Sequence, residues 1–176
     1  KSEGPPPEDA WRLIEQSRLV AEALAWGEHF DPSLFDLFCE RRLLPGLVAA
    51  LCAPRVPAAA KVQLLQTLSM MSQNVRHETS WYYLLSGGHL SKLFDRGVGG
   101  ADEELTAWFV SFEKSLALRL DANTVTLCID RATGRFPLFE SLAKHAVHGD
   151  QMVRTSARTA LLTLLRRCTG GEAQAA

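Results

Sequence analysis

The sequence has few cysteines and no excess of charge of either sign. Cys39, Cys52, Cys128 and Cys168 form no CxxC pair and have no histidine at the spacing of a zinc site. We therefore expect reduced, buried thiols, although two disulfides in a secreted chain are the alternative that four cysteines leave open. Lysine and arginine total 19 against 20 aspartates and glutamates, a net charge of −1. Binding to nucleic-acid phosphates usually needs a positive excess, so we expect no nucleic-acid partner.

The sequence also has no long apolar run. No stretch approaches the roughly 18 consecutive apolar residues that a membrane-spanning helix needs, so we expect none to cross a bilayer. Hydrophobic residues make up 47% and charged residues 22% of the 176 residues, values typical of a globular domain. We predict a flexible leader at residues 1–8, a helical domain at 9–168 and a disordered tail at 169–176.

Apolar residues recur with helical spacing in three long segments, residues 61–75, 102–120 and 150–167. Small residues on the last of these would let it pack closely on a neighbour, as in the inner helix of an armadillo or HEAT unit. The three apolar stripes are Leu64, Leu68, Met71 and Val75; Leu105, Trp108, Phe109, Phe112, Leu116 and Leu120; and Val153, Ala157, Ala160, Leu161 and Leu164.

Shorter helices are marked by their end signals. A first helix is predicted from residue 9 to about residue 26, and Asp31 followed by Pro32 opens another. An aromatic helix begins near His77 and should end at Gly87-Gly88, where glycine adopts the left-handed conformation. Residues 97–100 resemble a linker, since no strand precedes their glycines and no Gly-Lys-Ser/Thr ending follows.

The segment after residue 120 changes its pattern. Residues 124–129 are rich in β-branched side chains, residues 130–134 are typical of a turn, and Phe136-Pro137-Leu138-Phe139 follows. This pattern predicts one β-hairpin or extended excursion. The expected fold is therefore all-α, an irregular armadillo/HEAT-like α-solenoid with one β-hairpin excursion.

No motif carries a convincing catalytic, cofactor or metal site. His77-Glu78-Thr79-Ser80-Trp81 begins like HExxH, but Trp81 occupies the position of the second zinc ligand. Ser111 and Ser141 each start an SxxK pattern without the companion motifs of acyl-transfer enzymes. We predict a non-enzymatic chain with no cofactor, leaving open a hydrolase whose Ser/His or Ser/Lys pair converges from distant residues.

Several histidines and arginines have a binding interpretation and a structural one. His145 and His148 lie one turn apart, but a pair without a third ligand is more often a surface feature than a metal site. Arg154 is expected to make structural polar contacts. A contact with an acidic partner or with membrane headgroups is the hypothesis for Arg158, Arg166 and Arg167.

Several blocks, taken together and in order, resemble the FPL domain, the N-terminal region of a eukaryotic family that includes the endosomal maturation defective protein, Ema. The longest block is residues 77–86, and the resemblance runs from about residue 26 to residue 165. The blocks are 26–27, 33–38, 62–68, 77–86, 111–116, 123–125, 136–139 and 152–154. Within them, His77, Glu78, Phe136, Pro137, Leu138 and Arg154 are motif residues that we expect to be structural.

The resemblance implies a function in endosomal and lysosomal trafficking and autophagy. It implies a cytoplasmic protein, peripheral to endosome, lysosome or Golgi membranes, that binds tethering complexes of the class C Vps/HOPS type. A regulatory module of ubiquitin-ligase machinery in mitophagy or autophagy is the alternative. The family motif supplies no catalytic residue.

Overall fold

The computed structural model describes residues 8–100 and 102–170, and this part of the chain is all-α. It contains nine α-helices, one 3-10 helix and no strand. Glu8, predicted to belong to the leader, already lies in the first helix, and the last helix continues to Gly170. The rest of the predicted leader and tail lies outside the described residues. The helices are α1 (Glu8–Phe30), α2 (Ser33–Glu40), α3 (Leu43–Cys52), α4 (Ala58–Asn74), α5 (Glu78–Leu85), α6 (His89–Arg96), α7 (Glu103–Arg119), α8 (Pro137–His145) and α9 (Gln151–Gly170), with the 3-10 helix η1 at Thr124–Cys128.

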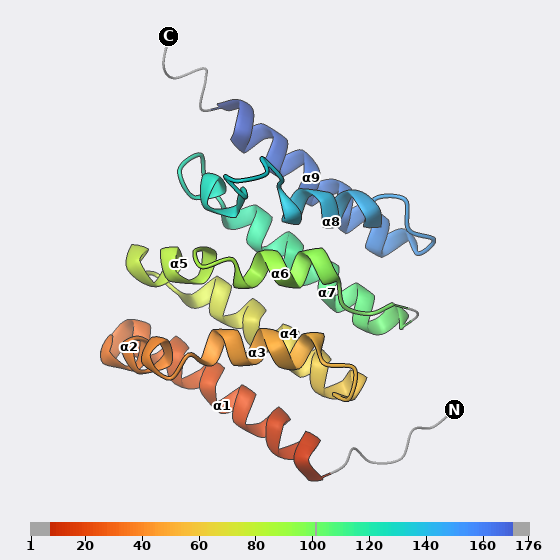
Figure 1. Ribbon diagram of the computed structural model, residues 1–176. Coiled ribbons are helices and arrows are strands. Elements are labelled where there is room, and N and C mark those ends of the chain that lie inside the picture. Colours follow the sequence, from red (N-terminus) through yellow and green to blue (C-terminus); the bar gives the residue numbers. More distant parts are fainter. Residues whose placement is uncertain (1–7, 101, 171–176) are drawn as a thin grey trace.

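The helices form two layers, and the chain advances steadily from α1 at one end to α9 at the other (Figure 1). The long helices make one layer, in which α1 packs on α4, α4 on α7, and α7 on α9. The short helices make the other, in which α3 packs on α6 and α6 on α8. A long helix followed by short ones is thus the recurring unit.

The core runs through the middle of both layers. Leu64 and Leu68 of α4 and Phe109, Phe112 and Leu116 of α7 are buried, as the apolar stripes predict. On α9, Ala157 and Ala160 have no exposed surface, so their small side chains let α9 approach α7 closely. Among the described helices, none combines the length and the apolar character needed to cross a membrane.

The helices end close to the predicted positions, and local side chains and glycines explain where they stop. The Asp102 carboxylate caps α7 by accepting a hydrogen bond from the Leu105 backbone N–H at 2.9 Å. Gly87 and Gly88 follow α5 with positive φ angles of 75° and 68°, a conformation that costs glycine little. The start of α2 lies one residue beyond Pro32, and Asp31 accepts a hydrogen bond from the Ser33 backbone N–H.

The prediction of buried thiols holds for one cysteine only. All four cysteines are free. Cys128 is buried, and burial raises the pKa of its thiol to about 12. Cys168 is exposed, while the remaining two are half-buried.

The predicted β-hairpin is wrong, because a side chain next to the β-branched residues favours a helical turn. Asp121 accepts hydrogen bonds from the backbone N–H of Asn123 and Thr124 and from the Thr124 hydroxyl. These contacts start η1 instead of a strand, and Val125 and Cys128 of η1 are buried. Pro137, expected in the returning strand, occupies the first turn of α8, where its missing N–H costs nothing.

Two charged side chains hold the corner between α4 and α5. The Arg119 guanidinium from α7 donates hydrogen bonds to the backbone oxygens of Ser72 and Val75. It also lies over the Trp81 ring, 4.2 Å from the ring centroid. From α1, the Glu28 carboxylate accepts hydrogen bonds from the backbone N–H groups of residues 76 and 77 at 2.7 and 3.0 Å. Side chains from α1 and α7 therefore satisfy the backbone groups of a single turn.

Replacing Arg119 by alanine should lower the free energy of unfolding by about 2–3 kcal/mol, since two carbonyl groups lose a charged donor and Trp81 loses its cation. Urea denaturation followed by circular dichroism measures the change. Arg12→Ala removes an exposed arginine from α1 and should shift stability by less than about 0.5 kcal/mol. Equal stability of the two variants would contradict a structural role for Arg119.

Candidate functional site

The predicted arginines of α9 mostly contact their own chain. Nη1 of Arg154 donates hydrogen bonds to the backbone oxygens of His148 and Gly149 at 2.6 and 3.0 Å. Nε of Arg158 donates to the backbone oxygen of Ala146 at 3.0 Å. Both side chains therefore close the loop between α8 and α9. Arg166 and Arg167 lie exposed in the last turns of α9, and the contact of Arg158, Arg166 and Arg167 with a partner or membrane stays a prediction.

The Phe136-Pro137-Leu138 motif starts α8. Pro137 and Leu138 are buried, and the half-buried Phe136 ring stacks on Phe139 at a centroid distance of 6.2 Å. These positions match a packing role for the motif.

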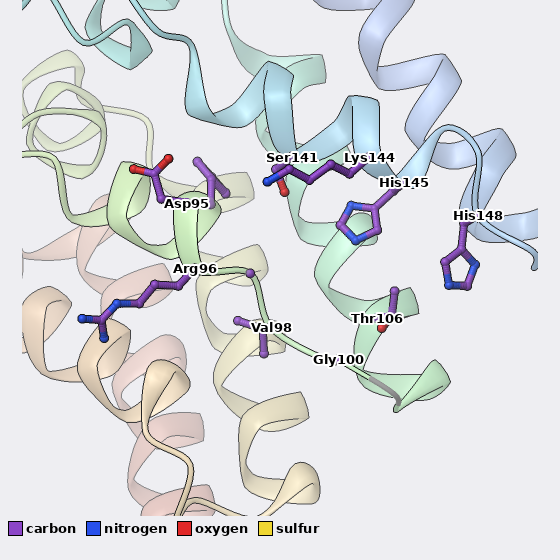
Figure 2. Close-up of a pocket in the computed structure, with 11 residues that line it drawn as sticks. Asp95, Arg96, Val98, Gly100, Thr106, Ser141, Lys144, His145 and His148 are labelled. Carbon is purple, nitrogen blue, oxygen red and sulfur yellow. The ribbon is translucent and has the colours of Figure 1, made fainter. Parts of the chain in front are cut away.

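One cleft, of about 280 Å³, lies between α6, the segment after it, α7 and α8. It brings together Ser141, Lys144, His145 and His148, which include one SxxK pair and the two histidines considered above. Figure 2 shows His145 extending from α8 toward α7, with His148 on the following loop. In the described part of the chain, no group of three or more histidine, cysteine, aspartate or glutamate side chains is placed to hold a metal ion.

The group behind this cleft that the sequence patterns do not single out is Glu113. Its side chain has no exposed surface, and its Oε2 lies 3.5 Å from Nδ1 of His145. Burial raises the pKa of the Glu113 carboxyl group, and contacts with His145 and Ser141 offset this only in part. One feature of the sequence could have indicated that Glu113 is buried. It lies on the apolar stripe of α7, four residues after Phe109 and three before Leu116.

The serine of the cluster around Glu113 is buried. A reactive serine presents its Oγ to substrate within reach of a base. Ser141 is only 2% exposed and lies beside the Glu113 carboxyl group, while Nδ1 of His145 faces the same carboxyl group. These contacts join α7 and α8.

A second, larger cleft, of about 470 Å³, lies where the end of α1, α2 and the start of α5 meet. Two of the blocks that carry the resemblance line it, residues 33–38 and 77–86. His77 is part of the lining, whereas Glu78 is exposed at the first position of α5 and is not. The lining residues are Glu28, Pro32, Phe35, Asp36, Cys39, His77, Thr79, Ser80 and Tyr83.

Aromatic packing forms one side of this cleft. The Tyr83 ring meets Phe35 edge to face at a centroid distance of 5.9 Å and Phe38 at 6.4 Å. Burial, together with the contact between Cys39 and Tyr83, raises the pKa of the Tyr83 hydroxyl group. Burial and the nearby Asp36 carboxylate raise the pKa of the Cys39 thiol. Both groups are therefore neutral at physiological pH.

Glu28 is the buried charge of the same cleft, with only 7% of its surface exposed. Desolvation raises the pKa of its carboxyl group. The hydrogen bonds from the backbone N–H of Arg76 and His77, together with the contact of the Ser80 hydroxyl group, outweigh this effect, so the pKa is lowered. The sequence patterns do not single out Glu28, although it lies four residues after the buried Leu24 on α1.

Comparison with known proteins identifies the family. A family model named FPL, described as an uncharacterised conserved protein, matches residues 17–165. The chain belongs to the FPL family. The predicted resemblance is thereby confirmed.

Individual relatives of this FPL-family chain come from animals and a plant. The chain is 36% identical over 154 residues to the protein CLEC16A homolog of Caenorhabditis elegans and 35% identical over 154 residues to the protein CLEC16A of Homo sapiens. It is 31% identical over 155 residues to the protein TRANSPARENT TESTA 9 of Arabidopsis thaliana. These alignments cover 86–88% of this chain but only 14–18% of the relatives' own lengths. No solved structure matches the chain.

Replacing Glu113 by glutamine should stabilise the protein increasingly as pH rises. A carboxyl group whose pKa is higher in the folded state than in the unfolded state binds more protons when folded, so wild-type stability falls as pH rises above the ordinary value of 4.5. Glutamine has no carboxyl group to ionise, so the variant does not lose stability in this way as pH rises. Chemical denaturation of both proteins between about pH 4 and pH 8 measures the difference.

The control is Glu104→Gln, which removes a carboxylate from the same helix without touching the buried pair. A stability advantage of Glu113→Gln that shrinks with rising pH would mean that His145 holds Glu113 ionised.

Proposed function

We propose that this FPL-family chain is a non-catalytic protein-interaction scaffold of a cytosolic membrane-trafficking factor, and that the cleft between α1, α2 and α5 is its binding site. The observation that carries this proposal is the convergence of residues 33–38 and 77–86 on one open cleft that contains an ionised, buried glutamate. Binding sites typically combine an apolar lining with a few fixed polar groups.

The arrangement of the helices supports the scaffold function. Long helices packed in one layer and short helices in the other match the repeating units of an armadillo/HEAT-like solenoid, the architecture we propose for the chain. Stacks of this kind bind proteins through extended surfaces. The clefts here open between successive units, where a partner segment contacts more than one helix.

The surroundings of Ser141 support a non-enzymatic function. Its burial argues against the hydrolase alternative, because a reactive serine must present its Oγ to the substrate. Ser111 is exposed on α7 and lines a groove. The other described residues that line this groove include Glu103, Glu104 and Asp150 but neither histidine nor lysine.

The proposed partners are endosomal and lysosomal tethering complexes of the class C Vps/HOPS type, which the chain would meet in the cytoplasm at the membrane surface. Membership of the FPL family supports this choice. The alternative, a regulatory module of ubiquitin-ligase machinery, has no structural observation in its favour.

Site-specific photo-crosslinking tests the scaffold and its location. With p-benzoylphenylalanine in place of Thr79, an exposed residue of the cleft, the chain should crosslink to a purified class C Vps/HOPS-type complex. The same group in place of Thr159, exposed on α9, is the matched control and should give a much weaker band. If the complex neither crosslinks to nor co-elutes with the chain at low salt, the proposed partner is wrong.

A further inference from the structure

The larger cleft has a negative lining. Glu28 and Asp36 contribute carboxylates, and no lysine or arginine is present among the described residues that line it. The Asp36 side chain is exposed on α2, whereas Glu28 lies deep in the cleft. The chemistry of the lining therefore favours a cationic occupant over an anionic one.

The two oxygens of Glu28 differ in their partners. Oε2 accepts both backbone hydrogen bonds from the α4–α5 corner, whereas Oε1 is buried and forms no hydrogen bond of ordinary geometry with the described residues. The Ser80 hydroxyl group lies close enough to the carboxyl group to lower its pKa. Leaving a buried charged oxygen without a donor is costly, so most such atoms in folded proteins have a partner. The negative charge of Glu28 is thus only partly compensated by hydrogen bonds within the chain.

The nearest cation of the chain does not supply this donor. Arg119 interacts with Glu28 electrostatically but forms no ion pair with it within 4.0 Å in the described residues. Its guanidinium is occupied by the backbone oxygens of Ser72 and Val75 and by the Trp81 ring. The positive charge of Arg119 lowers the free energy needed to bury the Glu28 carboxylate. It does not cancel the negative charge of the cleft lining.

The remaining lining suits an aliphatic chain with a charged end. Pro32, Phe35 and Tyr83 offer apolar and aromatic surface beside the two carboxylates. Lysine and arginine side chains bury their methylene groups against such surface while the cationic head reaches a polar group. Aromatic rings next to the head add a cation–π contribution.

We propose that this cleft binds a lysine or arginine side chain of a partner protein, with its methylene groups against Phe35 and Tyr83 and its cationic head facing the carboxylate of Glu28. Asp36 at the cleft mouth attracts the same cation. The inference rests on the proposed scaffold function and specifies the chemistry of the partner segment.

An NMR titration tests this inference directly. Nα-acetyl-lysine methylamide should shift the backbone signals of residues 77–83, and the norleucine analogue, which lacks the ammonium group, should leave them unchanged. Glu28→Gln and Asp36→Asn should each weaken lysine binding, by about ten-fold for the buried residue. Glutamine still offers an oxygen to the backbone N–H groups of Arg76 and His77, and Asp36 is exposed, so both variants should fold.

The matched control is Glu40→Gln, which removes one charge from α2 outside the cleft and should bind the lysine derivative as the wild type does. Equal shifts with the lysine and norleucine derivatives would overturn the inference. So would unchanged lysine affinity in both cleft variants.

Binding of the tethering complex to the same proteins separates the inference from the proposed function. If the complex binds the wild type and both cleft variants equally, and the lysine derivative causes no NMR shifts, the scaffold function is supported and the cationic site is refuted. Lysine binding without binding of the complex refutes the proposed partner and leaves the cationic site standing.

Discussion

The paired contacts of Arg119 and Glu28 with the α4–α5 corner are the interaction on which the rest of the structure depends. An α-helix ends with carbonyl groups that lack a partner, and the next begins with unpaired N–H groups. Here α7 supplies a cation for carbonyl groups at the end of α4, and α1 supplies an anion for the N–H groups of residues 76 and 77, which lie immediately before α5. The direction in which α5 leaves the long-helix layer is thereby fixed. The cleft follows from that direction, since α5 forms one of its walls.

Two buried glutamates show how local donors set the charge of a site. Glu28 receives two backbone N–H groups and has a lowered pKa, whereas Glu113 faces an imidazole at 3.5 Å and has a raised pKa because burial dominates. The first carboxylate reaches a cleft open to a partner, and the second is enclosed between α7 and α8. Burial alone therefore does not mark a functional carboxylate in this chain. The fixed backbone donors and the adjoining cleft distinguish Glu28.

The sequence patterns predict the helices better than the site. Apolar periodicity locates α4, α7 and α9, because their stripes are packed into a continuous core, and Asp102 and Gly87-Gly88 set helix ends through local chemistry. The hairpin is predicted wrongly because three hydrogen bonds to Asp121 outweigh the β-propensity of residues 124–129. The cleft could not be predicted in the same way. Its carboxylate and the corner that it caps are separated by 48 and 49 residues, and periodicity carries no information about contacts at such a distance. The sequence patterns indicate His77 only as a motif residue, and the structure places it in the lining of the cleft. Arg154 and Arg158 hold the loop between α8 and α9.

Because helices from three successive units meet at the α4–α5 corner, the units are not energetically independent. A simple stack is stabilised by contacts between nearest neighbours, and its end units can melt while the rest persists. In this chain the corner of the second unit is satisfied only when α1 before it and α7 after it are docked. Loss of either α1 or α7 leaves polar backbone groups of the α4–α5 corner without partners. The first three units should therefore open together in a single cooperative transition, and the cleft should disappear with them.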